Sequence, residues 1–156
     1  MTRRGLLTTT GLGVLAAMLA RRAAAAEQFA VTHTDAEWRK ILTPAQYDIL
    51  RDHGTEPPFS SPLDHNFTKG RYDCAGCGQH LFLSETKFDS GTGWPSFYQP
   101  IKGGVSTTSD SSLMMERTEV HCARCGGHLG HVFDDGPKPT GLRYCMDGLA
   151  LVFQKA

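Results

Sequence analysis

Two matching cysteine pairs constrain the fold of this chain more than any other feature of its sequence. Cys74 and Cys77 form one Cys-x-x-Cys unit, Cys122 and Cys125 form a second, and a glycine follows each unit. A glycine at that position permits the left-handed backbone of a tight turn. Two such turns can supply four sulfurs in the tetrahedral arrangement that zinc prefers. The sequence therefore predicts one structural zinc ion per chain.

Two alternatives to zinc exist for these cysteines. An exported protein could join them as disulfides, and one Cys-x-x-Cys unit could be a redox motif. The repetition of the unit, with glycine after each pair, favours the metal. Because a four-sulfur site leaves no open position for water, the ion is expected to hold the fold together, and zinc-dependent hydrolysis is not expected.

Residues 1–26 have the three parts of an export signal. Arg3 and Arg4 lie near the start, residues 6–20 are apolar, and four alanines precede Glu27. The apolar segment is short for a bilayer span, although a permanent N-terminal anchor is the alternative. The arginine pair followed by leucines resembles a twin-arginine signal, which exports folded proteins; an ordinary signal with a chance arginine pair is the other interpretation. We expect a periplasmic bacterial protein without stable membrane association once the signal is removed.

The rest of the chain has the length of one domain and a modest negative charge. Four of the 16 basic residues lie in residues 1–26, which contain no acidic residue, so residues 27–156 carry 12 minus 16, or −4. No basic patch with interleaved aromatic residues is present, so nucleic acid is not an expected partner. We expect a short extension over residues 27–34 and a single monomeric domain over residues 35–156.

The N-terminal part of this domain predicts two short helices. The first begins at Thr34 or Asp35 and continues through Leu42. The second begins at Thr43, with Pro44 in its first turn and Gln46 completing a capping box, and it ends at Gly54. The buried face of the first helix is expected to carry Trp38, Ile41 and Leu42.

From about Gly70 onward the pattern is typical of short strands separated by turns rich in Gly, Ser, Asp and Pro. We expect strands over residues 79–83, 113–121, 128–133 and 142–153. The predicted fold class is therefore mainly β and antiparallel, with short helices at the N-terminus.

Cys145 is the fifth cysteine and remains without a metal role. A lone cysteine is more often a small buried apolar residue than a nucleophile. If residues 142–153 form one strand, however, Arg143, Cys145 and Asp147 share a face. Arg143 would then favour the thiolate, and His128 and His131 in the preceding glycine-rich segment could supply protons.

Four segments closely resemble the B-type peptide-methionine sulfoxide reductases: residues 54–63, 89–97, 128–137 and 143–145. The Cys-x-x-Cys units also lie where zinc-bearing members have theirs, and the resemblance extends over most of residues 35–153. It implies two antiparallel sheets in a zinc-stapled, tent-like arrangement. It also implies reduction of the R epimer of methionine sulfoxide, free or in oxidised proteins, since each epimer has its own enzyme.

The resemblance also implies roles for individual residues. Cys145 matches the nucleophile, which would reduce the sulfoxide and become a sulfenic acid. Trp94 matches the ring that receives the sulfoxide methyl group. The remaining matches are to catalytic positions, at His128, His131 and Arg143, and to substrate-binding positions, at Phe133, Asp135 and Asp147.

Two positions depart from the family pattern. Many relatives have a resolving cysteine where this chain has Thr92, so we expect a one-cysteine cycle in which a thioredoxin-like protein or a small thiol reduces Cys145. Asp147 replaces the usual Asn. If ionised, it would raise the pKa of the thiol, and if protonated it could donate a hydrogen bond as Asn does.

Two other functions fit part of the pattern. A non-enzymatic zinc-bound β module that binds peptides or small guanine nucleotide-binding proteins would need the four paired cysteines but not Cys145. A periplasmic thiol peroxidase or disulfide exchanger would use Cys145. A stereospecific sulfoxide assay separates these from a reductase.

Overall fold

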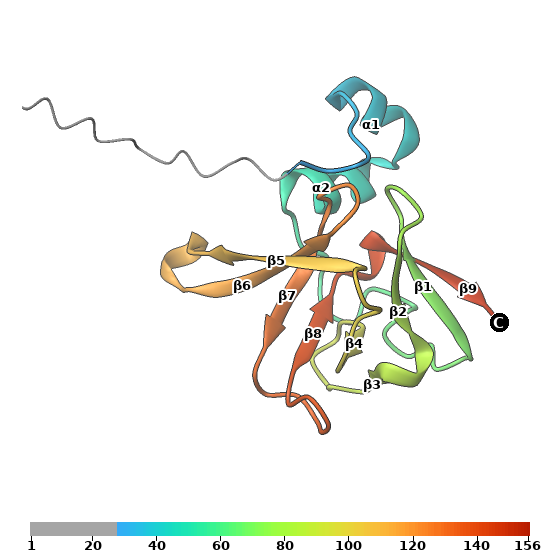
Figure 1. The fold of residues 1–156 in the computed structure, drawn as a ribbon, viewed down its shortest axis with the longest axis vertical. Coiled ribbons are helices and arrows are strands. Elements are labelled where there is room, and N and C mark those ends of the chain that lie inside the picture. Colours follow the sequence, from blue (N-terminus) through green and yellow to red (C-terminus); the bar gives the residue numbers. More distant parts are fainter. Residues whose placement is uncertain (1–27) are drawn as a thin grey trace, which may run out of the picture.

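The computed structural model describes residues 28–156, in which nine strands form two antiparallel sheets next to two short helices (Figure 1). One sheet has three strands in the order β2-β1-β9, and the other has six in the order β3-β4-β8-β7-β6-β5. The predicted fold class is therefore confirmed. The expected signal, residues 1–26, lies outside the described residues. The strands are β1 Gly70–Cys74, β2 His80–Leu83, β3 Lys87–Phe88, β4 Ser96–Phe97, β5 Val105–Asp110, β6 Arg117–Cys122, β7 His128–Phe133, β8 Arg143–Met146 and β9 Leu151–Lys155.

Capping boxes begin both helices. In α1 (Asp35–Ile41) the cap is Thr34, whose hydroxyl accepts the amide of Glu37, and in α2 (Pro44–Asp52) it is Thr43. The end of α2 differs from the prediction. His53, and not Gly54, takes the left-handed conformation, with φ of 56°.

Only part of the predicted face of α1 is buried. Trp38 and Leu42 are 2% and 5% exposed, whereas Ile41 is 53% exposed. Residues four apart lie along one row of a helix, and Ile41 lies to the side of the row formed by Trp38 and Leu42. The short helix therefore packs on the domain through that row alone.

Aromatic side chains join the two sheets. Phe82 of β2 stacks on Phe97 of β4 with ring centroids 4.3 Å apart, and Tyr72 of β1 meets the edge of Phe97 at 5.0 Å. All three are fully buried. Burying one such side chain contributes about 1.5–3 kcal/mol. This cluster fixes β4, and with it the neighbouring strand β8 that carries Cys145.

The prediction of a single strand over residues 142–153 is wrong. Strand β8 ends at Met146, a 3₁₀ turn covers Gly148–Ala150, and β9 then joins the other sheet. The break has a physical cause in Glu56, whose carboxylate accepts hydrogen bonds from the amides of Gly148 and Leu149 at 2.6 and 2.9 Å. A distant carboxylate thus stabilises a turn that the local pattern does not reveal.

The strand predicted over residues 113–121 is also shifted, because a 3₁₀ turn occupies Ser112–Met114 and β6 begins only at Arg117.

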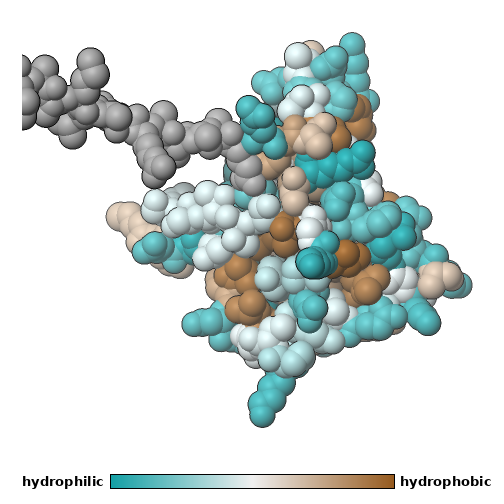
Figure 2. Space-filling view, viewed as in Figure 1, coloured by the Kyte–Doolittle hydropathy of each residue, from teal (hydrophilic) through white to brown (hydrophobic). Residues whose placement is uncertain are grey.

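On the face drawn in Figure 2, apolar side chains lie in small patches among polar ones. Within residues 28–156, no helix has the length and apolar character needed to cross a membrane.

Candidate active site and metal site

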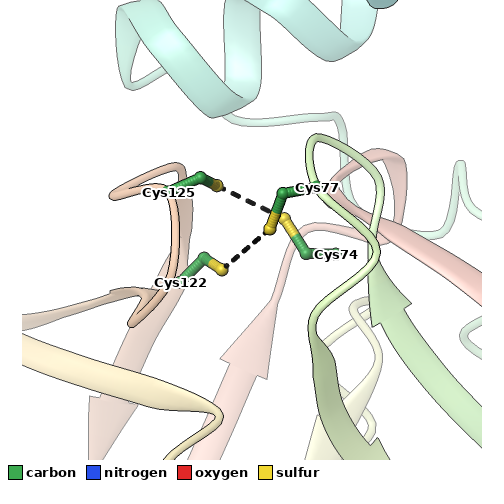
Figure 3. Close-up of side chains that lie close together, drawn as sticks. All are labelled: Cys74, Cys77, Cys122 and Cys125. Carbon is green, nitrogen blue, oxygen red and sulfur yellow. Dashed lines mark hydrogen bonds between the residues drawn. The ribbon is translucent and has the colours of Figure 1, made fainter. Parts of the chain in front are cut away.

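The four paired cysteines meet where two hairpin turns face each other (Figure 3). Cys74 and Cys77 lie in the β1–β2 turn of one sheet, and Cys122 and Cys125 in the β6–β7 turn of the other. The Sγ atoms of Cys74 and Cys125 are 3.8 Å apart, those of Cys77 and Cys122 are 3.6 Å apart, and all four lie within 4.8 Å of one another. Tetrahedral zinc with Zn–S bonds of about 2.3 Å requires sulfurs about 3.8 Å apart. The four cysteines therefore form a candidate metal site that joins the two sheets.

The two cysteine turns have the same backbone geometry. Gly78 and Gly126 have φ of 70° and 68°, as predicted. Their amides donate to the carbonyls of Cys74 and Cys122 at 2.8 and 2.9 Å. The left-handed glycine closes each turn so that both of its cysteines face the opposite turn.

Cys145 lies in β8, opposite Ser96 of β4 and His131 of β7. Its Sγ is 3.8 Å from the hydroxyl of Thr92, and Ser90 links Thr92 to Ser96 through hydroxyl contacts of 2.8 and 2.7 Å. The sulfur borders a cavity of about 150 Å³. The cavity is lined by Thr55, Trp94, Arg117, Gly130, His131, Phe133, Cys145 and Asp147.

Gly130 brings β7 close to the strand that carries Cys145. Its φ is 145°, in the region that side chains rarely adopt, and a Cβ atom there would overlap the carbonyl oxygen of Cys145. Only glycine fits this position without moving β8.

Two aromatic rings wall the cavity. Trp94 is oriented by its indole N–H, which donates to the carbonyl of Glu56 at 3.1 Å. The guanidinium of Arg143 lies 4.4 Å from the centre of the Phe133 ring, and both oxygens of Asp135 accept hydrogen bonds from Arg143 at 2.8 Å. Arg143 and Asp135 thus support Phe133 and do not line the cavity themselves.

Burial dominates the ionisation of Cys145. It raises the pKa of the thiol above the ordinary value, while the Thr92 hydroxyl and the charge of Arg143 lower it. An ionised Asp147 raises it further. Arg143 acts in the expected direction and favours the thiolate, but the cost of burying a thiolate is larger, so the net shift of the Cys145 pKa is upward.

Asp147 is 4% exposed and its ionisation is strongly perturbed. Burial raises its pKa to about 7, although its carboxylate accepts the amide hydrogen of Glu56 at 3.0 Å. A substantial fraction of Asp147 is therefore protonated at neutral pH. Burial thus favours the neutral form of Asp147, which can donate a hydrogen bond, over the ionised form.

The two histidines have different positions. His131 lines the cavity beside Cys145, and its Nε2 is 2.8 Å from a carboxylate oxygen of Asp110. His128 is 3% exposed, contacts Glu119 through Nδ1 at 2.7 Å, and lines a neighbouring cavity of about 550 Å³. Burial lowers the pKa of His128 and so favours its neutral form. Only His131 is placed directly at the sulfur's cavity.

Sequence reasoning missed several contributors to the site. Thr55 and Arg117 line the cavity. Glu119 contacts His128 behind the cavity, and the carbonyl of Glu56 accepts the indole N–H of Trp94. The sequence did carry a signal for Arg117 and Glu119. Arg117 and Glu119 alternate within a predicted strand, so they share a face. Glu56 lies between turn residues and prolines and offers no local sign of its contacts.

Comparison with known proteins agrees with this geometry. The SelR domain model matches residues 42–155. Proteins named peptide methionine sulfoxide reductase MsrB are 58% identical in Agrobacterium fabrum and 59% identical in Leptospira interrogans, over 80% and 81% of this chain and 93% and 98% of those proteins. One from Methanosarcina barkeri is 57% identical over 81% of this chain and 90% of its own length. The chain therefore belongs to the SelR-domain family of B-type methionine sulfoxide reductases and is an oxidoreductase.

Proposed function

We propose that this chain reduces the R epimer of methionine sulfoxide, free or in proteins, through a sulfenic acid on Cys145. The observation that carries the proposal is the position of the Cys145 sulfur at a small cavity walled by Trp94 and Phe133. An aromatic surface suits the S-methyl group of the substrate. The sulfoxide oxygen then faces the polar side of the cavity, where His131 and Asp147 lie.

The reaction transfers one oxygen atom. The Cys145 thiolate attacks the sulfoxide sulfur and forms a transient S–S bond, while the oxygen takes up a proton. The hydroxyl then passes to the Cys145 sulfur as the S–S and S–O bonds of the substrate sulfur break, which leaves methionine and a sulfenic acid. The oxygen must gain one proton before its bond to the substrate sulfur breaks. We assign delivery of this proton to His131 at the cavity, with His128 placed behind it and protonated Asp147 donating a hydrogen bond to the oxygen.

Regeneration is proposed to use an external thiol. Four of the five cysteines lie together in the candidate metal site, and Thr92 occupies the position next to Cys145. Two thiol groups of a thioredoxin-like protein or a small-thiol reductant convert the sulfenic acid to thiol and water, and they become a disulfide. No internal disulfide involving Cys145 is expected in this cycle.

The metal is proposed to be one structural zinc ion per chain. Four thiolates at tetrahedral spacing match the preference of zinc and leave no site for water. The ion would stabilise the junction between the sheets and supply no step of the reaction. Measuring bound metal by mass spectrometry on the purified protein tests this proposal, and a bound iron-sulfur cluster or an absence of metal would contradict it.

The central test uses separated sulfoxide epimers with dithiothreitol as reductant. Consumption of the R epimer alone, abolished by Cys145→Ser, is the expected result. Consumption of neither epimer would favour a peptide-binding module, and peroxide consumption in its place would favour a thiol peroxidase.

We also propose export to a bacterial periplasm, on the basis of the pattern of residues 1–26. Export through the twin-arginine route is tested with Arg3→Lys and Arg4→Lys together. This change should leave the precursor in the cytoplasm, and unchanged export would contradict the proposed route. We propose that the mature protein is a monomer, and its sedimentation in solution tests this oligomeric state.

A further inference from the structure

A second cluster of possible metal ligands lies beside the active site. His53 and His128 both direct Nδ1 at one carboxylate oxygen of Glu119, at 3.1 and 2.7 Å. The three ligand atoms lie within 4.8 Å of one another. The residues come from the end of α2, from β6 and from the start of β7, so three separate elements of the fold bring them together.

The spacing of these atoms suits a small divalent ion. Tetrahedral zinc with ligand bonds of about 2.0–2.1 Å places its ligand atoms about 3.4 Å apart. To accept the ion, the His53–Glu119 contact of 3.1 Å would widen by about 0.3 Å and the His128–Glu119 contact of 2.7 Å by about 0.7 Å. Two histidines and one glutamate are a ligand set that zinc uses when one position remains open to water.

The surroundings allow an ion to enter. The three residues border the cavity of about 550 Å³, together with Thr55, Asp110 and His131. His128 is 3% exposed and Glu119 is 14% exposed, so two ligands are held in place. The third, His53, is 61% exposed and forms the edge of the site.

The backbone at His53 sets the direction of its side chain. It adopts a left-handed conformation with φ of 56°, which is uncommon for a residue other than glycine. This conformation ends α2, where a left-handed residue is common. Here it directs the imidazole of His53 at Glu119 and towards His128, with the two rings 5.1 Å apart.

We propose that His53, Glu119 and His128 form a second, reversible binding site for a divalent zinc-like ion, and that its occupation slows the reductase. The slowing rests on the proposed function, because the ion would fix His128, which lies behind the catalytic cavity and against His131 with the rings 5.4 Å apart. Binding itself does not depend on that function.

The binding test is calorimetric titration of Zn²⁺ into the reduced protein with its four-cysteine site already loaded. His53→Asn removes the imidazole while keeping a residue that tolerates the left-handed backbone. The matched control is His65→Asn, at another exposed histidine. Performing each titration also with Cys145→Ser excludes binding through the thiol.

We expect one additional ion, at least tenfold weaker binding in His53→Asn, and unchanged binding in His65→Asn. No additional binding, or equal binding in His53→Asn, would overturn the site.

The effect on turnover is measured with one equivalent of sulfoxide and no added thiol, because thiols chelate zinc. Zn²⁺ should slow formation of methionine at least tenfold in the wild type and the His65→Asn variant but not in His53→Asn. Binding without slowing would overturn the inhibitory role. Absence of turnover even without added Zn²⁺ would contradict the proposed function and leave the binding result intact.

Discussion

Replacing Asp147 by asparagine should stabilise the protein, and the gain should grow with pH. Below about pH 3.8, the ordinary pKa of the group, Asp147 is protonated in both the folded and unfolded chains. Between that value and its folded pKa of about 7, the folded chain keeps a proton that the unfolded chain has released. Each rise in pH across this range therefore favours unfolding. Above the folded pKa both states are ionised and the loss of stability is complete.

The magnitude follows from the two pKa values. A difference of about 3 corresponds to about 4 kcal/mol at alkaline pH. Asparagine keeps an oxygen that can accept the Glu56 amide hydrogen but carries no charge, so it avoids this cost. Acid releases zinc from thiolates, so the accessible range is about pH 6 to 8, over which the advantage of the variant should grow by about 1 kcal/mol.

Urea unfolding of the zinc-loaded wild type and Asp147→Asn across that range measures the effect. An asparagine variant at the exposed Asp134 is the control and should show no such growth. Activity of Asp147→Asn should be similar to the wild type or better. A free-energy difference that is the same at every pH would refute the account of Asp147 as a buried carboxyl, and a collapse of turnover would show that its acid group is required.

Four further results are expected. Alkylation of Cys145 by iodoacetamide should rise with pH and be half-maximal above pH 9, because burial raises its pKa; rapid reaction at pH 7 would contradict this. Thr92→Cys should form a disulfide with Cys145 after one turnover, since the Thr92 hydroxyl lies 3.8 Å from the sulfur, and a persistent sulfenic acid would count against that geometry. Gly130→Ala should cost about 3 kcal/mol in urea unfolding because β8 must move, whereas an unchanged midpoint would contradict the close approach. Removing the metal with a chelator should cost on the order of 10 kcal/mol and unfold the domain, and retained β-sheet circular dichroism would argue against a structural ion.

The parts of the fold that local sequence rules determine were predictable. The capping boxes at Thr34 and Thr43 and the left-handed glycines after each cysteine pair depend on neighbours within a few residues, and the structure agrees with them. The grouping of four cysteines was predictable as well, because the repeated spacing carries its own geometric meaning.

Features that depend on distant contacts were not predictable. The break between β8 and β9 depends on Glu56, about ninety residues earlier in the chain, which accepts the amides of Gly148 and Leu149. The raised pKa of Cys145 likewise reflects burial, which no local pattern reports. The position of His128 behind the cavity depends on its contact with Glu119 across two strands.

Intact-protein mass spectrometry after a single turnover tests the central claim most directly. The reduced, metal-loaded protein receives one equivalent of the R sulfoxide without any thiol. The account predicts one added oxygen atom, localised to Cys145 by trapping with dimedone, and one equivalent of methionine. A disulfide that includes Cys145, or methionine formed while Cys145 remains an unmodified thiol, would contradict it.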